Sequence, residues 1–157
     1  MKKLEDIKHK DLVLENVICE KVQHIKMEEV NTYIVSFLNR LQLLNVKTSG
    51  KLITKMCGYE FAKNGEMRVS YELIIEVLED CKEYQTLPCY THKNCLFLHY
   101  EGLQLDFEMA NLKLQLYMFE NEFVSEGIVY TYTHMHKDQH LIADIYVPIV
   151  EETYADI

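Results

Sequence analysis

The stretch over residues 141–150 alternates between two kinds of side chain. Four apolar residues at odd positions face one way, namely Ala143, Ile145, Val147 and Ile149. Asp144, Tyr146 and Pro148 occupy the even positions between them. A period of two is typical of a β-strand whose two faces have different surroundings. The apolar face suits packing against a helix, whereas the other face carries a carboxylate and a phenol two residues apart.

A second stretch of the same kind lies 72 residues earlier, over residues 69–80. At this offset Glu72 matches Asp144, Leu73 matches Ile145, and the acidic pair at 79–80 matches the pair at 151–152. Two strands with the same acidic and apolar pattern indicate an internal duplication.

Two helices are predicted, over residues 27–44 and 103–119, each with an apolar stripe at helical spacing. The first stripe is Val30, Ile34, Phe37, Leu41 and Leu44. The second is Leu105, Met109, Leu112, Leu116 and Phe119. The stripes match position by position at an offset of 75, as do His24 and His99. Both stripes are therefore predicted to face the sheet.

Six strands are predicted around these helices, over residues 12–25, 52–61, 66–78, 89–100, 126–134 and 140–150. Asn64-Gly65 predicts a hairpin between the second and third strands, because both residues accept positive φ. The order β-α-β-β then occurs twice, in repeats over about 12–80 and 89–152. We expect an α+β fold in one domain over residues 1–157. Its antiparallel sheet would carry two helices on one face and a groove on the other.

Composition narrows the class of protein. The net charge of −9 argues against direct binding to nucleic acid, which needs a basic face. The five cysteines form no CxxC pair, as expected of free thiols in a reducing compartment. Neither a signal peptide nor an apolar run long enough to span a membrane is found. We therefore expect a cytoplasmic protein without a membrane partner.

The duplicated plan, which ends in Asp144-Ile145-Tyr146-Val147-Pro148-Ile149, resembles the GyrI-like effector-binding domains. These are the ligand-sensing parts of bacterial multidrug-responsive transcription activators, and they also occur as stand-alone proteins. The resemblance implies a stand-alone member, since only about ten residues precede the first strand. In sensing members a glutamate in an aromatic-lined groove binds cationic, lipophilic ligands. The resemblance assigns that role to Asp144, whose side chain is one methylene shorter than that of glutamate. Tyrosines would supply the aromatic rings in place of tryptophan.

The candidate ligand-binding residues are Asp144, Tyr146, Tyr130, Tyr132, Tyr71 and Glu72. A buried carboxylate favours a cation or a hydrogen-bond donor, and tyrosine rings attract cations. The alternative is structural. In that case the tyrosines fill one face of the sheet and donate their hydroxyls to Asp144 and Glu72.

Other polar groups are interpreted as structural. His134, His136 and His140 could supply zinc ligands, but their place at a predicted hairpin tip favours a solvated turn. Cys57 and Cys95 lie within predicted strands and suit small core residues better than reactive thiols. The acids around Glu76 and residues 79–83 are expected at a solvated edge. No metal and no cofactor is predicted.

Three functions remain open. The first is a stand-alone module that binds a small organic, possibly cationic, effector. The alternative is a protein-interaction module, either similar to gyrase inhibitors or an adaptor or chaperone of a secreted bacterial toxin. The third is a hydrolase of reactive small toxins with Asp144 as acid or base, as in some relatives of the fold. It ranks last, so we expect a binding protein and not an enzyme.

Overall fold

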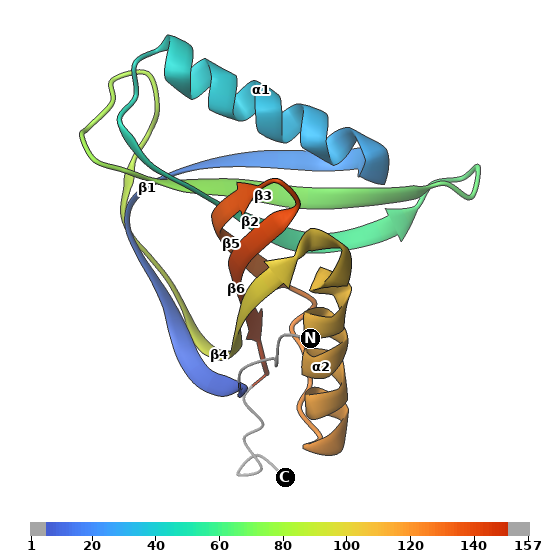
Figure 1. The fold of residues 1–157 in the computed structure, drawn as a ribbon. Coiled ribbons are helices and arrows are strands. Elements are labelled where there is room, and N and C mark those ends of the chain that lie inside the picture. Colours follow the sequence, from blue (N-terminus) through green and yellow to red (C-terminus); the bar gives the residue numbers. More distant parts are fainter. Residues whose placement is uncertain (1–5, 151–157) are drawn as a thin grey trace, which may run out of the picture.

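The computed structural model describes residues 6–150, and the match of residues 79–80 to 151–152 lies partly outside them. Its elements are β1 (Lys8–Lys26), α1 (Val30–Leu43), β2 (Thr48–Phe61), β3 (Met67–Val77), β4 (Leu87–Leu103), α2 (Phe107–Glu120), β5 (Val129–Lys137) and β6 (His140–Pro148). One turn of 3-10 helix precedes each α-helix, η1 (Met27–Glu29) and η2 (Gln104–Asp106). The order β-α-β-β thus occurs twice, as the sequence predicts (Figure 1).

The strands form a closed barrel in the order β1-β3-β2-β5-β6-β4, and every pairing is antiparallel. The α+β class and the antiparallel sheet are confirmed, but the sheet is a closed barrel and does not have two free faces. Closure depends on the two longest strands. The first half of β1 pairs with the first half of β4, and the second half of each pairs within its own repeat.

Each long strand bends near the point where its partner changes. Asn16 in β1 and Asn94 in β4 adopt left-handed backbone angles, with φ of 51° and 60°. Asparagine tolerates this region better than most residues with a side chain. The two positions are equivalent in the repeats, because their neighbours Ile18 and Leu96 pair with the equivalent residues Ile75 and Val147. A matched bend in each repeat therefore lets two three-stranded units join at both edges.

Both hairpins have the expected order, and one has a tighter turn than predicted. In the β2–β3 turn Gly65 has a φ of 83° and donates its amide hydrogen to Ala62. The β5–β6 hairpin turns at Asp138-Gln139, whereas the sequence indicated a five-residue turn. Both residues have positive φ, 51° and 64°, as in the type I′ turns that suit two-residue hairpins. The strands therefore continue up to this turn.

Helix α1 packs on the outside of the barrel with the predicted face. Phe37 and Leu41 are buried against the β1 and β3 residues Ile18, Leu73 and Ile75. Val30 and Ile34 pack against the same cluster, while Leu44, at the end of the stripe, is exposed. The first stripe is therefore correct over its first four positions.

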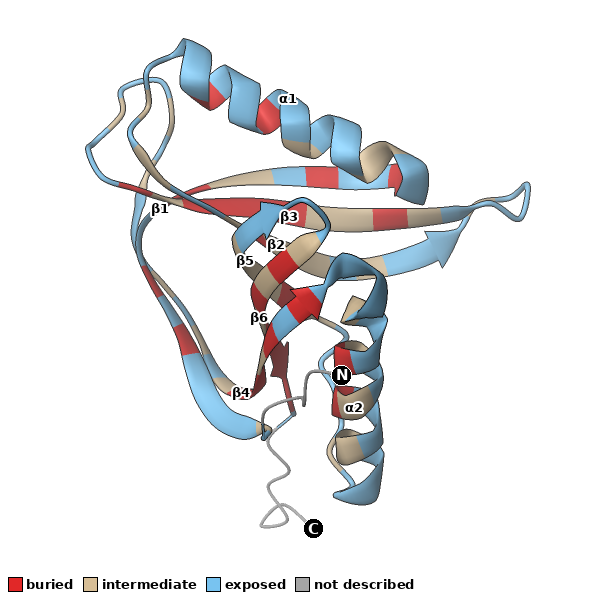
Figure 2. Cartoon of the chain, viewed as in Figure 1, coloured by how far each residue is buried: buried red, intermediate tan, exposed pale blue. Residues whose placement is uncertain are grey.

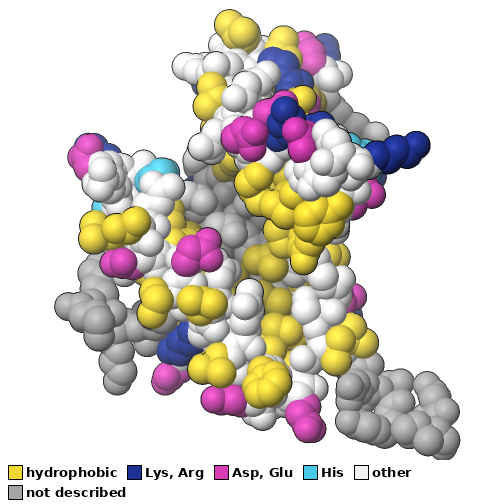
Figure 3. Space-filling model, turned by 90° about the vertical axis from the view of Figure 1, so that its right-hand side faces the viewer, with side chains coloured by type: hydrophobic (Ala, Val, Ile, Leu, Met, Phe, Trp, Pro, Cys, Tyr) yellow, Lys and Arg dark blue, Asp and Glu magenta, His cyan; other side chains and the backbone are white. Residues whose placement is uncertain are grey.

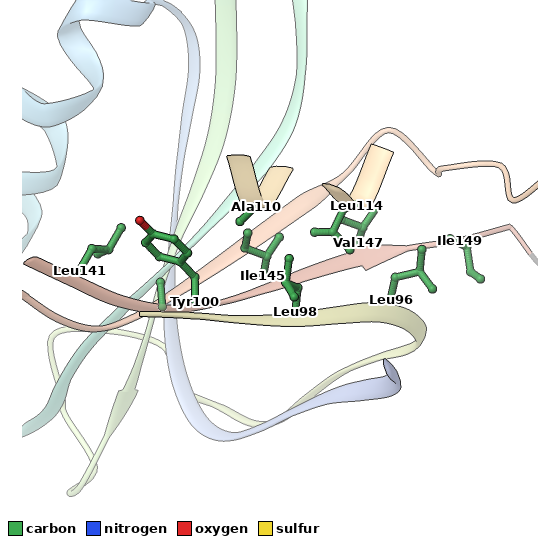
Figure 4. Packing of buried hydrophobic residues seen from close by; sticks show 10 residues of the cluster. Leu96, Leu98, Tyr100, Ala110, Leu114, Leu141, Ile145, Val147 and Ile149 are labelled. Carbon is green, nitrogen blue, oxygen red and sulfur yellow. The ribbon is translucent and has the colours of Figure 1, made fainter. Parts of the chain in front are cut away.

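Helix α2 packs with the face opposite to the predicted one. Ala110 and Leu114 are buried, and Figure 4 shows them directed toward Leu98, Ile145 and Val147 of the sheet. All five residues of the predicted stripe are instead exposed. The helices correspond at an offset of 77, since Val30 begins one and Phe107 the other. A two-residue error rotates a helix by about 200°, which exchanges its faces.

Three apolar clusters result, one under each helix and one inside the barrel. The strands carry most of the buried positions, and the helices are mainly exposed on their outer sides (Figure 2). Within residues 6–150, no helix is long and apolar enough to cross a membrane. The interior cluster occupies the face on which the sequence predicted a groove.

Candidate functional site

The even-numbered residues of β6 face the interior of the barrel, as do those of β5 before its register shift at residues 133–135. Tyr130 and Tyr146 are opposite each other in the pairing of these strands, and both are buried in the interior cluster. Ile53 and Ile74, from the first repeat, belong to the same cluster. Alternation explains this arrangement, because the odd-numbered residues of β6 pack under α2. The middle of the interior is therefore filled by side chains.

Asp144 lies beside this cluster and accepts hydrogen bonds from two imidazoles. His99 Nδ1 donates to Oδ1 of Asp144 over 2.6 Å, and His134 Nε2 donates to Oδ2 over 2.7 Å. The Asp144 side chain is 14% exposed, whereas about a quarter of each histidine side chain is exposed. Burial of a carboxylate at this depth is costly without such donors. We call Asp144, His99, His134 and Tyr132 the Asp144 cluster.

Tyr132 adds an aromatic surface to this cluster. Its ring stacks on that of His134, with centroids 4.6 Å apart and an angle of 18° between the planes. Its hydroxyl donates to Oε1 of Glu76 on β3, at 2.9 Å. Burial, followed by the interaction with Glu76, raises the pKa of Tyr132 well above its usual range. The Tyr132 ring is therefore an uncharged aromatic surface beside Asp144. Glu76 fixes its hydroxyl, and His134 stacks on its face.

Tyr130 belongs to a chain of hydrogen bonds elsewhere on the interior face. Its hydroxyl lies 3.0 Å from that of Tyr90 and 2.8 Å from Nδ1 of His92. Nε2 of His92 donates to Oε2 of Glu126 at 2.9 Å, and in the neutral tautomer that does so Nδ1 accepts a hydrogen bond from the Tyr130 hydroxyl. Burial, followed by the hydrogen bond with Tyr90, raises the pKa of Tyr130 far above its usual range.

Glu72 is buried on the side of β3 that faces the barrel interior, two residues from Ile74 of the interior cluster. Burial, then the charge of Glu72 and a hydrogen bond to it, raises the pKa of the Cys19 thiol to about 12. Lys55, across the β2–β3 pairing from Glu72, supplies a nearby positive charge. Burial alone would lower the pKa of Lys55, but Tyr90 and Glu72 raise it overall. Glu72 thus lies close to a thiol and to a lysine.

The structure brings five of the six candidate residues to the interior face, namely Asp144, Tyr146, Tyr130, Tyr132 and Glu72. Tyr71 lies on the other face of β3, packed with the cluster under α1. Adjacent residues of a strand point in opposite directions, so Tyr71 and Glu72 do not share a face. The tyrosines do fill the interior, as the structural alternative stated. The hydroxyls of Tyr130 and Tyr132, however, bond to Tyr90, His92 and Glu76 and not to Asp144 or Glu72.

The three histidines near the last hairpin do not converge. His134 binds Asp144, whereas Nε2 of His136 lies 2.7 Å from the side-chain oxygen of Gln104. The register of β5 shifts between Thr133 and Met135, which breaks the alternation that would place both imidazoles on one side. Within residues 6–150, no group of three or more histidine, cysteine or acidic side chains is arranged to hold a metal ion.

Several polar residues of the interior were not found from the sequence. His92, Tyr90 and Lys55 were not singled out, and Glu76 was assigned to a solvated edge. The signal for Glu76 was present, since it shares the even-numbered face of β3 with Glu72. His92 and Tyr90 had no such signal, because they reach Tyr130 only through the pairing of β4 with β1 that closes the barrel.

Comparison by sequence finds no match, either to a family model or to a curated protein. Comparison by structure finds several. The C-terminal domain of EcmrR aligns over 94% of this chain and 98% of that domain, with a TM-score of 0.65 and 10% identity. SAV2435 bound to tetraphenylphosphonium aligns over 93% of this chain and 94% of that one, with a TM-score of 0.53 and 12% identity.

The EcmrR–DNA complex aligns over 94% of this chain, with a TM-score of 0.65 and 11% identity, but this chain spans only 58% of the EcmrR chain. The two EcmrR alignments therefore concern one domain of that longer chain. The chain therefore shares its fold with the C-terminal domain of EcmrR and with SAV2435, which agrees with the resemblance described from the sequence.

Proposed function

We propose that the chain is an effector-binding module that binds a lipophilic organic cation at the Asp144 cluster. One observation carries the proposal. A partly exposed carboxylate lies between aromatic rings, at the edge of the barrel interior, and its hydrogen-bond partners are imidazoles and not permanent cations. The same fold in SAV2435 was solved with tetraphenylphosphonium, a lipophilic cation.

The electrostatics support a cation over a neutral ligand. Unlike lysine or arginine, an imidazole carries no permanent charge, and in its neutral form it donates to Asp144 without cancelling the charge of the carboxylate. Glu76, held by Tyr132, adds a second carboxylate close to the cluster. At an effective dielectric constant of 20 and a separation of about 6 Å, one charge pair contributes about 3 kcal/mol. The rings of Tyr132 and His134 add contact with the apolar part of the ligand.

The test is a thermal-shift measurement with tetraphenylphosphonium and with triphenylphosphine oxide, a neutral compound of similar shape. A ligand that binds only the folded chain raises the midpoint by mass action. We expect the phosphonium to raise the midpoint by several degrees at 100 times its dissociation constant, and the neutral compound to have little effect. Equal midpoint shifts with both compounds would contradict a role for the charge of Asp144 in binding.

We propose binding and not catalysis. Both oxygens of Asp144 already accept hydrogen bonds, which disfavours a role as general acid or base. The raised pKa of the Tyr132 hydroxyl likewise disfavours its ionisation at neutral pH. The five free cysteines, all within the described residues, fit action in the cytoplasm.

A further inference from the structure

Helix α2 has a second apolar face, which points away from the barrel. Five residues of η2 and α2 form it, each more than half exposed: Leu105, Met109, Leu112, Leu116 and Phe119. We call this set the α2 seam. Figure 3 shows hydrophobic side chains exposed on the side of the molecule where α2 lies, with acidic side chains among them.

The spacing of the seam is that of a helix–helix contact. Its residues are separated by four, three, four and three positions, which is the a/d pattern of a coiled coil over two heptads. The opposite face of α2 is already used, because Ala110 and Leu114 are buried against the sheet. A helix that is apolar on both sides is normally covered on both sides. The geometry of the seam fits a second helix lying along α2.

The charges beside the seam favour a basic partner. Asp106, Glu108 and Glu120 occupy flanking positions and are exposed, whereas Lys113 is the one basic residue within α2. A second copy of the chain would bring the same acidic flanks, and each copy carries a net charge of −9. Lysine and arginine at the flanking positions of a partner would instead attract these acids.

A pocket of about 380 Å³ adjoins the C-terminal end of the seam. It lies between α2 and the sheet, with Phe119, Met118 and Phe123 among its lining residues and Val129 and Val147 at its base. An apolar anchor of a docked helix could enter this space, and such central buried anchors contribute most of the affinity of an interface. Phe119 belongs both to the seam and to the lining of this pocket.

We propose that the α2 seam binds an amphipathic α-helix of a partner protein whose apolar stripe is flanked by lysine and arginine. Five apolar residues exposed along one face of a helix are the kind of surface patch that interaction sites use. The proposal does not depend on cation binding, since Asp144 lies on the interior face and the seam on the outside of α2.

The probe is a synthetic helical peptide of about 18 residues, with leucine at the a and d positions and lysine or arginine beside them. Binding is measured by fluorescence anisotropy with the full chain. We expect the double variant Leu112→Gln, Leu116→Gln to bind at least tenfold more weakly, although its net charge is unchanged. Leu43→Gln, at an exposed leucine of α1, is the matched control and should bind like the parent chain.

Three results would overturn the proposal. The first is equal binding of the peptide to the parent chain and the double variant. The second is equal binding of a peptide whose basic flanks are replaced by glutamate, because charge complementarity would then have no role. The third is a dimer of the parent chain, in sedimentation, that the double variant lacks, because a second copy would then occupy the seam.

Discussion

Replacing Leu114 by aspartate is expected to unfold most of the chain at room temperature. Leu114 is 1% exposed and lies on the face of α2 that packs against the strands β4 and β6. Truncating a buried leucine costs about 2–5 kcal/mol, and burying an unpaired carboxylate in its place adds to that. The sum is similar to the whole stability of a typical domain, about 5–15 kcal/mol. The free energy of unfolding is measured by urea denaturation, followed by circular dichroism.

Leu112→Asp is the matched control, since it changes the same residue type two positions away in the same helix. Leu112 is 56% exposed, so its replacement should change the free energy of unfolding by less than about 1 kcal/mol. The pair decides which face of α2 packs on the barrel. A large loss for Leu112→Asp with little change for Leu114→Asp would contradict the packing described above.

Replacing Asp144 by asparagine is expected to weaken the binding of tetraphenylphosphonium at least tenfold. The substitution keeps the size of the side chain and removes its charge. A charge pair worth about 3 kcal/mol corresponds to a factor of more than 100, and solvent screening at a partly exposed site reduces it. Isothermal titration calorimetry measures the dissociation constants of both proteins.

Glu28→Gln is the control for the loss of one negative charge. Glu28 is exposed, in the turn before α1. Its replacement lowers the net negative charge by the same amount as Asp144→Asn but leaves the Asp144 cluster unchanged. We expect its dissociation constant to equal that of the parent chain. Equal weakening in both variants would show that the phosphonium responds to overall charge and not to Asp144.

The fold could be predicted from the sequence where local pattern decides the structure. The strand alternation around Asp144 and Glu72 identified the repeat and the faces of β3 and β6. The closed barrel could not be predicted, because it depends on pairings between the repeats, β1 with β4 and β2 with β5. Asparagine within each long strand, at 16 and 94, was the signal of a bend that goes with this closure.

Helix α2 shows the limit of periodicity as evidence. Both of its faces are apolar at helical spacing, so the pattern alone could not say which one packs against the sheet. The stripe ending at Phe119 was chosen because it matched α1 at an offset of 75, and the correct offset is 77. The error has a physical meaning, since the face wrongly assigned to the core is the one proposed as the α2 seam.

The candidate site was predictable in part. Asp144 and its neighbouring tyrosines followed from the strand pattern and the resemblance. The role of His99 and His134 as partners of Asp144 depends on the register of β4 and β5 against β6, which one sequence does not reveal. Tyr71 was misplaced because it was grouped with Glu72 as a neighbour in sequence, although adjacent strand residues face apart.

The most direct test of the proposed function is the nuclear magnetic resonance of the histidine rings during a titration with tetraphenylphosphonium. His99 and His134 contact Asp144, whereas His24 lies beside Glu60 and His136 beside Gln104. We expect the ring signals of His99 and His134 to shift to saturation, while those of His24 and His136 stay in place. Saturation without a shift of His99 and His134, or no binding at all, would contradict it.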